Sequence, residues 1–196
     1  MNTGILRLWG AWDTIYQRCT RLRYIEKGNN IFRIVLLRYR GEPLVTADNR
    51  IIQTGDLILK LHIHNYYFAT LCQGVTDDLR VVLLLRRHIL KSLPQLAAYL
   101  STMEEVDQIK GIVGTTMLHK GVEPLGFSIS DVPMSWFFHY KRWYLRLMVR
   151  LIHPEGKDRV QRWDQIMPLK RVYMSKEELF RRYLSNELEP AGGTDS

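Results

Sequence analysis

The sequence predicts an α+β fold in which a mostly antiparallel sheet packs against several helices. Its expected strands cluster along the chain, whereas a doubly wound fold would alternate strands with helices. The chain has 196 residues, 46% hydrophobic and 24% charged, which is enough to bury a core without disulfides or metals. We expect one domain over residues 1–188. Residues 189–196 contain Pro and Gly but no apolar anchor, and we expect a disordered tail there.

The N-terminal third predicts one helix and then a series of short strands. Apolar residues recur every three or four positions over residues 5–19, as on one face of a helix. Residues 31–39 are rich in Ile, Val and Leu, which is typical of a strand. Turn residues then separate two shorter strands at 44–46 and 51–52.

Residues 57–63 form the clearest strand in the sequence. Alternate positions give one purely aliphatic face: Leu57, Leu59, Leu61 and Ile63. The opposite face becomes polar toward its end, where Lys60 and His62 lie, and Asn65 is expected to close the strand. Because an aliphatic strand face needs a covering layer, we expect helices to bury Leu59 and Leu61.

The middle of the chain predicts two helices and a hairpin. Asp77 or Asp78 is expected to cap a helix that runs to about residue 90, and Pro94 to start a second helix that ends near residue 103. A strand over residues 109–119 and a second one over residues 127–129 are expected to pair as a hairpin.

The C-terminal third predicts a long helix, a short strand and a final helix. The long helix covers residues 134–152, is apolar over most of its circumference, and is expected to help cover the sheet. A strand is expected at 171–174. Ser175 and Glu178 have the spacing of a capping box, which predicts a helix that ends near residue 188.

The positive charge of the chain is concentrated in two segments. The formal net charge is +8, and residues 1–27 and 133–163 hold the whole excess. No apolar run reaches the roughly 18 residues that a membrane span needs, so a cytoplasmic protein is expected. Such a chain can still lie against a membrane surface. Cys19 and Cys72 lack metal or redox spacing, and we expect buried, reduced thiols.

His62 and His64 are two positions apart, so on a strand both imidazoles would point the same way and could bind one metal ion. A metal site needs further ligands, and no acid follows until Asp77. The favoured interpretation is therefore two polar residues on a solvated strand face. We expect no cofactor.

A second candidate site has the residue types for general acid–base catalysis. Asp56, His62 and Asn65 supply an acid, an imidazole and an amide on one turn and strand, and His119 is a further candidate. The alternative for Asp56 is that it accepts backbone N–H groups in its own turn. Convergence of these side chains in one cleft would favour an enzyme.

A third candidate site is a basic stripe on the helix at 134–152. Three arginines and a lysine could meet phosphate or another anion: Lys141, Arg142, Arg146 and Arg150. The alternative is that they form the solvated edge of a core helix. Nucleic-acid binding is less favoured, because the aromatic residues lie at core spacing within the helices.

Several short motifs resemble the YkoP-like domain family, of which related domains are appended to some bacterial polysaccharide deacetylases. The segment from Gly55-Asp56 to His62 and Asn65 is similar to the GD…LHxxN motif of that family. Further matching segments are Gly114–Thr116, His119–Gly121, Leu125–Phe127, Trp143–Leu145, His153-Pro154 and Ser175. The resemblance implies a role in the cell envelope or in sporulation and implies no particular activity.

The favoured interpretation is an accessory module that binds an anionic ligand, and the cytoplasmic membrane surface is one place where such a ligand occurs. The first alternative is a small enzyme of envelope or polysaccharide metabolism that uses Asp56, His62 and Asn65. Nucleic-acid binding is the second alternative. Whether the protein is an enzyme stays open at this point, and no protein partner is predicted.

Overall fold

The computed structural model describes residues 10, 20–75, 77–116, 119, 121–132 and 168–184. The helix expected at 134–152 lies outside these residues, as does most of the one expected at 5–19. The tail expected over 189–196 also lies outside them.

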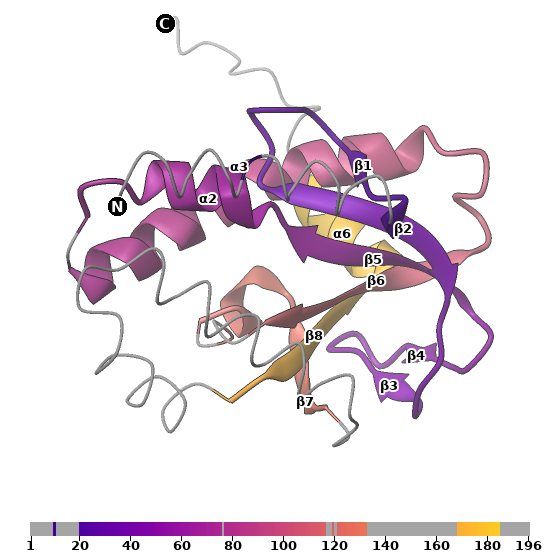
Figure 1. The fold of residues 1–196 in the computed structure, drawn as a ribbon. Helices are drawn as coiled ribbons and strands as arrows, with labels where there is room; N and C mark the ends of the chain where they lie inside the picture. Colours follow the sequence, from indigo (N-terminus) through magenta and orange to yellow (C-terminus); the bar gives the residue numbers. More distant parts are fainter. Residues whose placement is uncertain are drawn as a thin grey trace, which may run out of the picture.

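In the described part of the chain, six strands form the main sheet (Figure 1). They are β1 (Arg23–Tyr24), β2 (Phe32–Arg38), β5 (Leu57–Ile63), β6 (Ile109–Thr116), β7 (Ser128–Asp131) and β8 (Lys170–Ser175). Their order across the sheet is β1-β2-β5-β6-β8-β7. These neighbours pair antiparallel, apart from the parallel pair β5 and β6. The predicted α+β class with a mostly antiparallel sheet is confirmed.

Two helices connect the parallel strands β5 and β6: α2 (Asn65–Leu71) and α3 (Asp78–Ser101). Asp77 caps α3 by accepting a hydrogen bond from the Leu79 N–H at 2.9 Å, as predicted. Pro94 lies inside α3, so the prediction of two separate helices was wrong. A proline inside a helix costs about 3 kcal/mol. The adjacent Leu93, fully buried, belongs to an apolar face against the sheet whose burial outweighs that cost.

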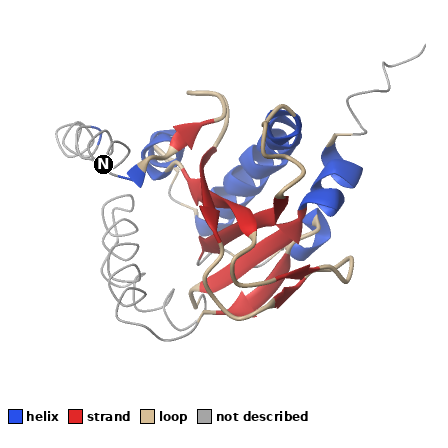
Figure 2. Cartoon of the chain, turned by 90° about the vertical axis from the view of Figure 1, so that its right-hand side faces the viewer, coloured by secondary structure: helices blue, strands red, loops and turns tan. Residues whose placement is uncertain are grey.

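One face of the sheet carries the main core. Leu59 and Leu61 on β5 are 0% and 7% exposed, and they pack in one cluster with Leu96 of α3. The final helix α6 (Lys176–Tyr183) lies on the same side and adds Leu179 to the cluster. Figures 1 and 2 show α3 and α6 on one side of the sheet. The predicted helical cover over the aliphatic face of β5 is therefore confirmed.

The second face of the sheet is partly covered by a small hairpin, β3 (Leu44–Val45) and β4 (Ile51–Ile52). The hairpin supplies Leu44 and Ile52 to a smaller core cluster. The sheet side of that cluster consists of Tyr39, Ile58, Val113 and Tyr173. This cover lies toward the N-terminal end of β5, where Ile58 is 2% exposed.

The predicted hairpin between residues 109–119 and 127–129 was wrong. β8 lies between β6 and β7 and pairs antiparallel with both. The connection after β6 contains the 3-10 turn η1 (Glu123–Leu125), and it buries Leu125 and Phe127 in the core. Because these two residues anchor the connection to the core, the connection is not a tight turn. The edge of β6 is therefore left to pair with β8, which comes much later in the chain.

Asn65 also differs from its predicted place, because it begins α2 instead of closing a strand. Among the described helices, none combines the length and the apolar composition that a membrane crossing requires.

Candidate functional site: a basic sheet face

The structure separates Asp56 from His62 and Asn65. Gly55 has a φ of +97°, which glycine adopts readily, and it forms the turn before β5. In that turn Asp56 Oδ2 accepts a hydrogen bond of 2.7 Å from the Gln53 N–H. Because a strand rises about 3.3 Å per residue, the six-residue step from Asp56 to His62 spans roughly 20 Å. Asp56 thus has the structural role in its own turn, away from the imidazole.

His62, Asn65 and His119 lie toward a common edge of the sheet. β5 and β6 are parallel, so their carboxyl ends meet at one edge. His62 and Asn65 come from the end of β5, and His119 follows the end of β6. His62 and Asn65 are half-buried. In open sheets that contain parallel strands, this edge is where ligands commonly bind.

His64 lies beyond the end of β5 and is 7% exposed among tyrosine rings. The centroid of its ring is 5.2 Å from the Tyr24 ring and 5.8 Å from the Tyr67 ring. Sequence spacing suggested that His62 and His64 share a strand face, whereas the strand ends at Ile63 between them. Over the described residues, no group of three or more His, Cys, Asp and Glu is placed to hold a metal ion.

A row of polar residues crosses the second face of the sheet near the carboxyl end of β5, away from the small hairpin. Arg33 on β2 is directly opposite His62 on β5. Arg171 on β8 is directly opposite Thr115 on β6 and Ser130 on β7. The last β5–β6 pair is Leu61 with Gly114, so His62 and Thr115 come next in register and join the two halves of the row.

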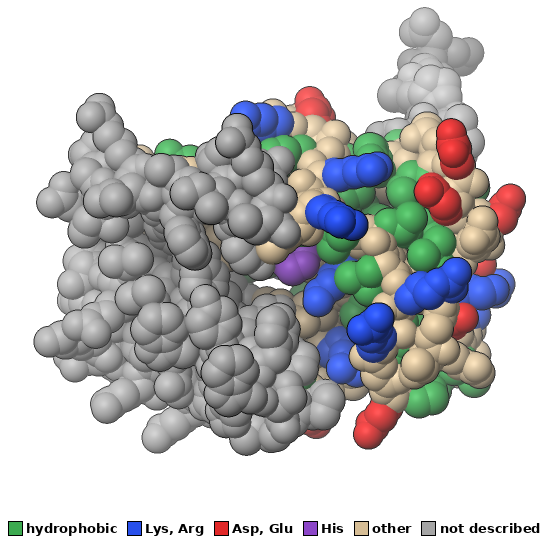
Figure 3. Space-filling view, turned by 45° about the vertical axis from the view of Figure 1, so that its right-hand side comes forward, with side chains coloured by type: hydrophobic (Ala, Val, Ile, Leu, Met, Phe, Trp, Pro, Cys, Tyr) green, Lys and Arg blue, Asp and Glu red, His purple; other side chains and the backbone are tan. Residues whose placement is uncertain are grey.

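Lys60 lies on the same face of β5, two residues before His62. We call Arg33, Lys60, His62 and Arg171 the basic face. Figure 3 shows other features of the surface: Lys and Arg side chains are spread over one side of the described part of the molecule, and a histidine lies among them.

Arg171 is the most precisely held cation of the basic face. It is 8% exposed, and its Nη1 donates a hydrogen bond of 2.9 Å to the Tyr39 phenol oxygen. That phenol donates in turn to the Glu42 carbonyl oxygen at 2.8 Å. Burial raises the pKa of Tyr39, although the Arg171 charge acts in the opposite direction. Tyr39 therefore stays a neutral phenol that fixes one arm of the guanidinium.

Lys60 is half-buried between two valines. Val35 on β2 and Val113 on β6 are its direct neighbours across the strands. Burial and, second, the nearby charge of Arg171 lower the pKa of Lys60 below its ordinary value of 10.5. Among the described residues, neither Lys60 nor Arg171 forms an ion pair with a carboxylate. Two cations of one sheet face thus lie in a poorly solvated place, and neither is ion-paired with an acid of the described residues.

Arg33 is the third fixed cation and is 2% exposed. Its Nη2 donates a hydrogen bond of 2.7 Å to the Tyr24 phenol, and its guanidinium carbon is 4.7 Å from the centroid of that ring. The hydrogen bond and the stacking hold the guanidinium of Arg33 in place.

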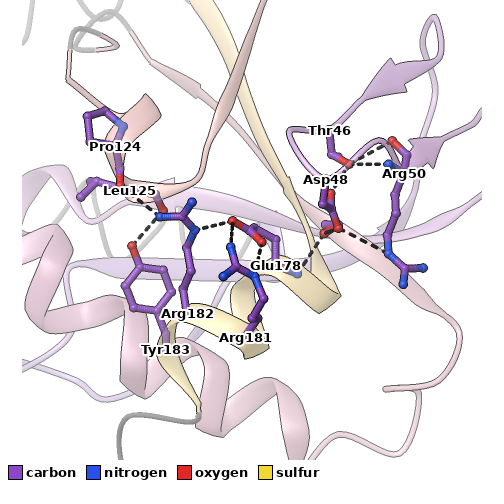
Figure 4. A network of polar contacts seen from close by, with 10 residues as sticks. Thr46, Asp48, Arg50, Pro124, Leu125, Glu178, Arg181, Arg182 and Tyr183 are labelled. Carbon is purple, nitrogen blue, oxygen red and sulfur yellow. Dashed lines mark hydrogen bonds and ion pairs between the residues drawn. The ribbon is translucent and has the colours of Figure 1, made fainter.

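A half-buried acid of the small hairpin, Asp48, and a buried acid of α6, Glu178, lie in a different network (Figure 4). Asp48 accepts hydrogen bonds from Thr46 Oγ1 at 2.5 Å and from Ser175 Oγ at 2.7 Å. Burial would raise the pKa of Asp48, but these hydrogen bonds outweigh it and lower the pKa. Ser175 also accepts from the Glu178 N–H at 3.0 Å, which confirms the predicted cap. Ser175 therefore links the small hairpin to α6.

Glu178 is 5% exposed and accepts hydrogen bonds from two arginines of its own helix, Arg181 and Arg182. Arg182 Nη1 reaches the Pro124 carbonyl oxygen at 3.2 Å, and Tyr183 Oη reaches the Leu125 carbonyl oxygen at 2.8 Å. Burial opposes ionisation of Glu178, but the arginines hold its pKa below the ordinary value. These contacts fasten α6 to the β6–β7 connection, so this network is structural.

The predicted anion-binding residues Lys141, Arg142, Arg146 and Arg150 lie outside the described residues. Sequence reasoning missed Arg33, Arg171 and Tyr39. The alternation of β5 could have placed Lys60 with His62, but nothing local connects either residue with Arg171, more than a hundred positions later.

The fold and site define a small α+β domain with cations on one face of its sheet. The chain belongs to the YkoP domain family, whose model matches residues 2–183. A protein of Bacillus subtilis (strain 168), described as "Uncharacterized protein YkoP", is 34% identical over 139 residues, which cover 70% of this chain and 75% of the relative. No solved structure matches the chain. The resemblance noted in the sequence is thereby confirmed.

Proposed function

We propose that this protein is a binding module that recognises an anionic partner through the basic face. The observation that carries the proposal is the pair Lys60 and Arg171, which the strand register places on one sheet face on either side of β6 and which form no ion pair with a carboxylate of the described residues.

The physical reason is the cost of an uncompensated charge. A cation removed from water loses hydration energy that only a counter-charge or good hydrogen bonds replace. A second cation nearby adds repulsion, and both effects lower the pKa of Lys60. An anion bound between Lys60 and Arg171 would relieve both effects at once, so binding is favoured over the empty state.

The burial of the site favours a small anionic group over an extended surface. Arg171 is only 8% exposed, so a flat layer of lipid headgroups or a nucleic-acid duplex cannot reach it without rearrangement. A single anionic substituent of a smaller molecule or a flexible polymer needs a much smaller opening. We place such a partner in the bacterial cell envelope or in sporulation, the setting that the family resemblance implies.

The geometry does not favour the enzyme alternative based on Asp56, His62 and Asn65. Asp56 lies roughly 20 Å along β5 from His62, too far to share a proton with it.

The experiment is a binding study at low ionic strength with the full chain. Soluble anions, anionic and neutral vesicles, and single-stranded nucleic acid are compared by their effect on melting temperature and by NMR titration. We expect soluble anions to bind, and we expect Lys60→Gln to weaken that binding while Lys110→Gln, at an exposed position of the neighbouring strand β6, leaves it unchanged.

A triple variant tests the basic stripe that the sequence predicts on residues 134–152. If Arg142, Arg146 and Arg150 are changed together to Gln and only this variant loses binding, the anionic partner binds the helix stripe and the basic face is the wrong surface. If no anion binds at low salt, the proposed function is wrong. A preference for anionic vesicles or nucleic acid over small anions would contradict the small-group form of the proposal.

A further inference from the structure

We infer that the basic face takes a tetrahedral oxyanion with two negative charges, such as the phosphate of a phosphate monoester, between Lys60 and Arg171. This inference rests on the proposed function and specifies the chemical class of the partner.

The number of positive charges favours an anion with two negative charges. Lys60 and Arg171 bring two positive charges to one face of the sheet, on either side of β6, and neither forms an ion pair with a carboxylate of the described residues. A carboxylate or a phosphodiester carries one negative charge and would leave one cation uncompensated. A phosphate monoester carries about −1.5 to −2 at pH 7 and compensates both.

The arrangement of hydrogen-bond donors favours a tetrahedral anion. Tyr39 holds Nη1 of Arg171, so the guanidinium is oriented before any ligand arrives. Thr115 and Ser130 are directly opposite Arg171 in register, one on each side, and they bring a hydroxyl group to each flank of the arginine. Hydroxyl groups can donate to the further oxygens of a tetrahedral anion. A planar carboxylate has only two oxygens and uses fewer of these donors.

The residues directly opposite Lys60 leave its ammonium group able to donate to a ligand. Its direct neighbours across the strands are the side chains of Val35 and Val113, which accept no hydrogen bond. An ammonium group has three donors. A ligand oxygen would therefore not compete with an acceptor from the residue directly opposite Lys60 on either neighbouring strand.

The same site predicts a pH dependence. The titratable or charged groups that the sheet presents on this face are Arg33 on β2, His62 on β5, Arg171 and Tyr173 on β8, and Tyr39 after β2. The small hairpin and the turn before it add two acids, Glu42 beside Tyr39 and Asp48 beside Ser175. Of the two cations that hold the anion, Lys60 is the one that loses its charge most easily, because its pKa lies below the ordinary 10.5. Affinity is expected to fall as the pH rises through that lowered pKa, and a bound dianion is expected to raise the pKa again.

The test compares anions of matched shape and different charge. Sulfate and methyl phosphate are tetrahedral dianions at pH 8, dimethyl phosphate is a tetrahedral monoanion, and acetate is a planar monoanion. They are titrated into the full chain at constant low ionic strength and followed by NMR. We expect the two dianions to bind at least about tenfold more tightly than the two monoanions, as one additional charge-assisted hydrogen bond provides.

The variants locate the effect. Lys60→Gln should bring the ratio between dianion and monoanion affinities close to one and remove the fall in affinity at high pH. Lys110→Gln should keep both, and preserved NMR spectra show that each variant is folded.

Each alternative result has its own meaning. If monoanions bind as tightly as dianions and Lys60→Gln weakens all of them equally, the proposed function stands and the inference about charge is overturned. If dianions bind with unchanged affinity to Lys60→Gln, the site is elsewhere and the inference is overturned. If none of the four anions binds, the inference and the proposed function fail together.

Discussion

Arg171 on β8 donates a hydrogen bond of 2.9 Å to the phenol of Tyr39, a residue 132 positions earlier in the chain. The guanidinium carbon also lies 5.7 Å from the centroid of the Tyr39 ring. Both side chains are buried, at 8% and 4% exposure. The contact fixes the arginine on the sheet face where Lys60 lies, and it fastens the chain just after β2 to β8 across two intervening strands.

Removing the Tyr39 hydroxyl should reduce stability and weaken anion binding. Tyr39→Phe keeps the ring but leaves one arm of a buried guanidinium without its acceptor, which costs about 1–3 kcal/mol. The free energy of unfolding from urea titration measures the loss. Tyr99→Phe is a matched control, because the Tyr99 phenol has no hydrogen bond to another described residue. Equal losses in the two variants would show that the contact with Arg171 contributes nothing special.

Replacing Lys60 with an apolar residue should stabilise the protein when no ligand is present. Lys60→Met removes a poorly solvated charge that Arg171 repels, and we expect a gain of roughly 1 kcal/mol at neutral pH. The gain should shrink as the pH rises toward 10.5, because Lys60 in the folded wild type has a lowered pKa and loses its charge before a lysine in the unfolded chain does.

Added sulfate should then reverse the order of stability of the two proteins. It should raise the melting temperature of the wild type and leave that of Lys60→Met nearly unchanged. Lys110→Met, at an exposed position on β6, is the control and should change little. A Lys60→Met variant that is clearly less stable than the wild type in the absence of anions would contradict the idea of an uncompensated charge.

Glu178 should stabilise the protein in a pH-dependent way. Glu178→Gln removes the charge that holds Arg181 and Arg182, and we expect a loss of about 1–3 kcal/mol at pH 7. The pKa of Glu178 is lowered in the folded state, so its contribution is complete above the ordinary value of 4.5 and disappears as the pH falls through the lowered pKa. The difference between wild type and variant, measured by thermal unfolding from pH 7 to pH 2, should vanish at the acid end.

The neighbouring Glu177 serves as the control for that measurement. Its side chain is 40% exposed and lies 3.4 Å from Arg50, a surface ion pair worth at most about 1 kcal/mol. A loss in Glu177→Gln as large as in Glu178→Gln would mean that burial of the carboxylate is unimportant.

Gly111 should tolerate no side chain. A Cβ at this position would lie far inside the van der Waals contact distance of the Met174 carbonyl oxygen, which belongs to the paired strand β8 and cannot move alone. Gly111→Ala should therefore cost about 3 kcal/mol or more, or prevent folding. Gly114→Ala on the same strand should cost much less, because the nearest atom is a Val172 methyl carbon at 3.3 Å. Comparable stabilities for the two variants would show that the close pairing of β6 with β8 is incorrect.

Features that depend on neighbours along the chain could be predicted from the sequence. The alternation in residues 57–63 identified β5 and the burial of Leu59 and Leu61. Asp77 and Ser175 marked the starts of α3 and α6, because a capping side chain bonds to a backbone N–H two or three residues away. The short motifs also identified the family. In each case the deciding interaction is local.

Which distant residues share the basic face depends on the tertiary structure. Lys60 and Arg171 share this face because β8 inserts between β6 and β7, in a register that puts both residues on the same side of the sheet. Strand order depends on which strand edges remain unpaired as the core forms. It cannot be predicted from the local periodicity of the sequence. The same reason explains the incorrect hairpin and the helix that continues through Pro94, where burial against the sheet outweighs a local preference. The candidate site is thus a product of register between strands, which no single segment of the sequence specifies.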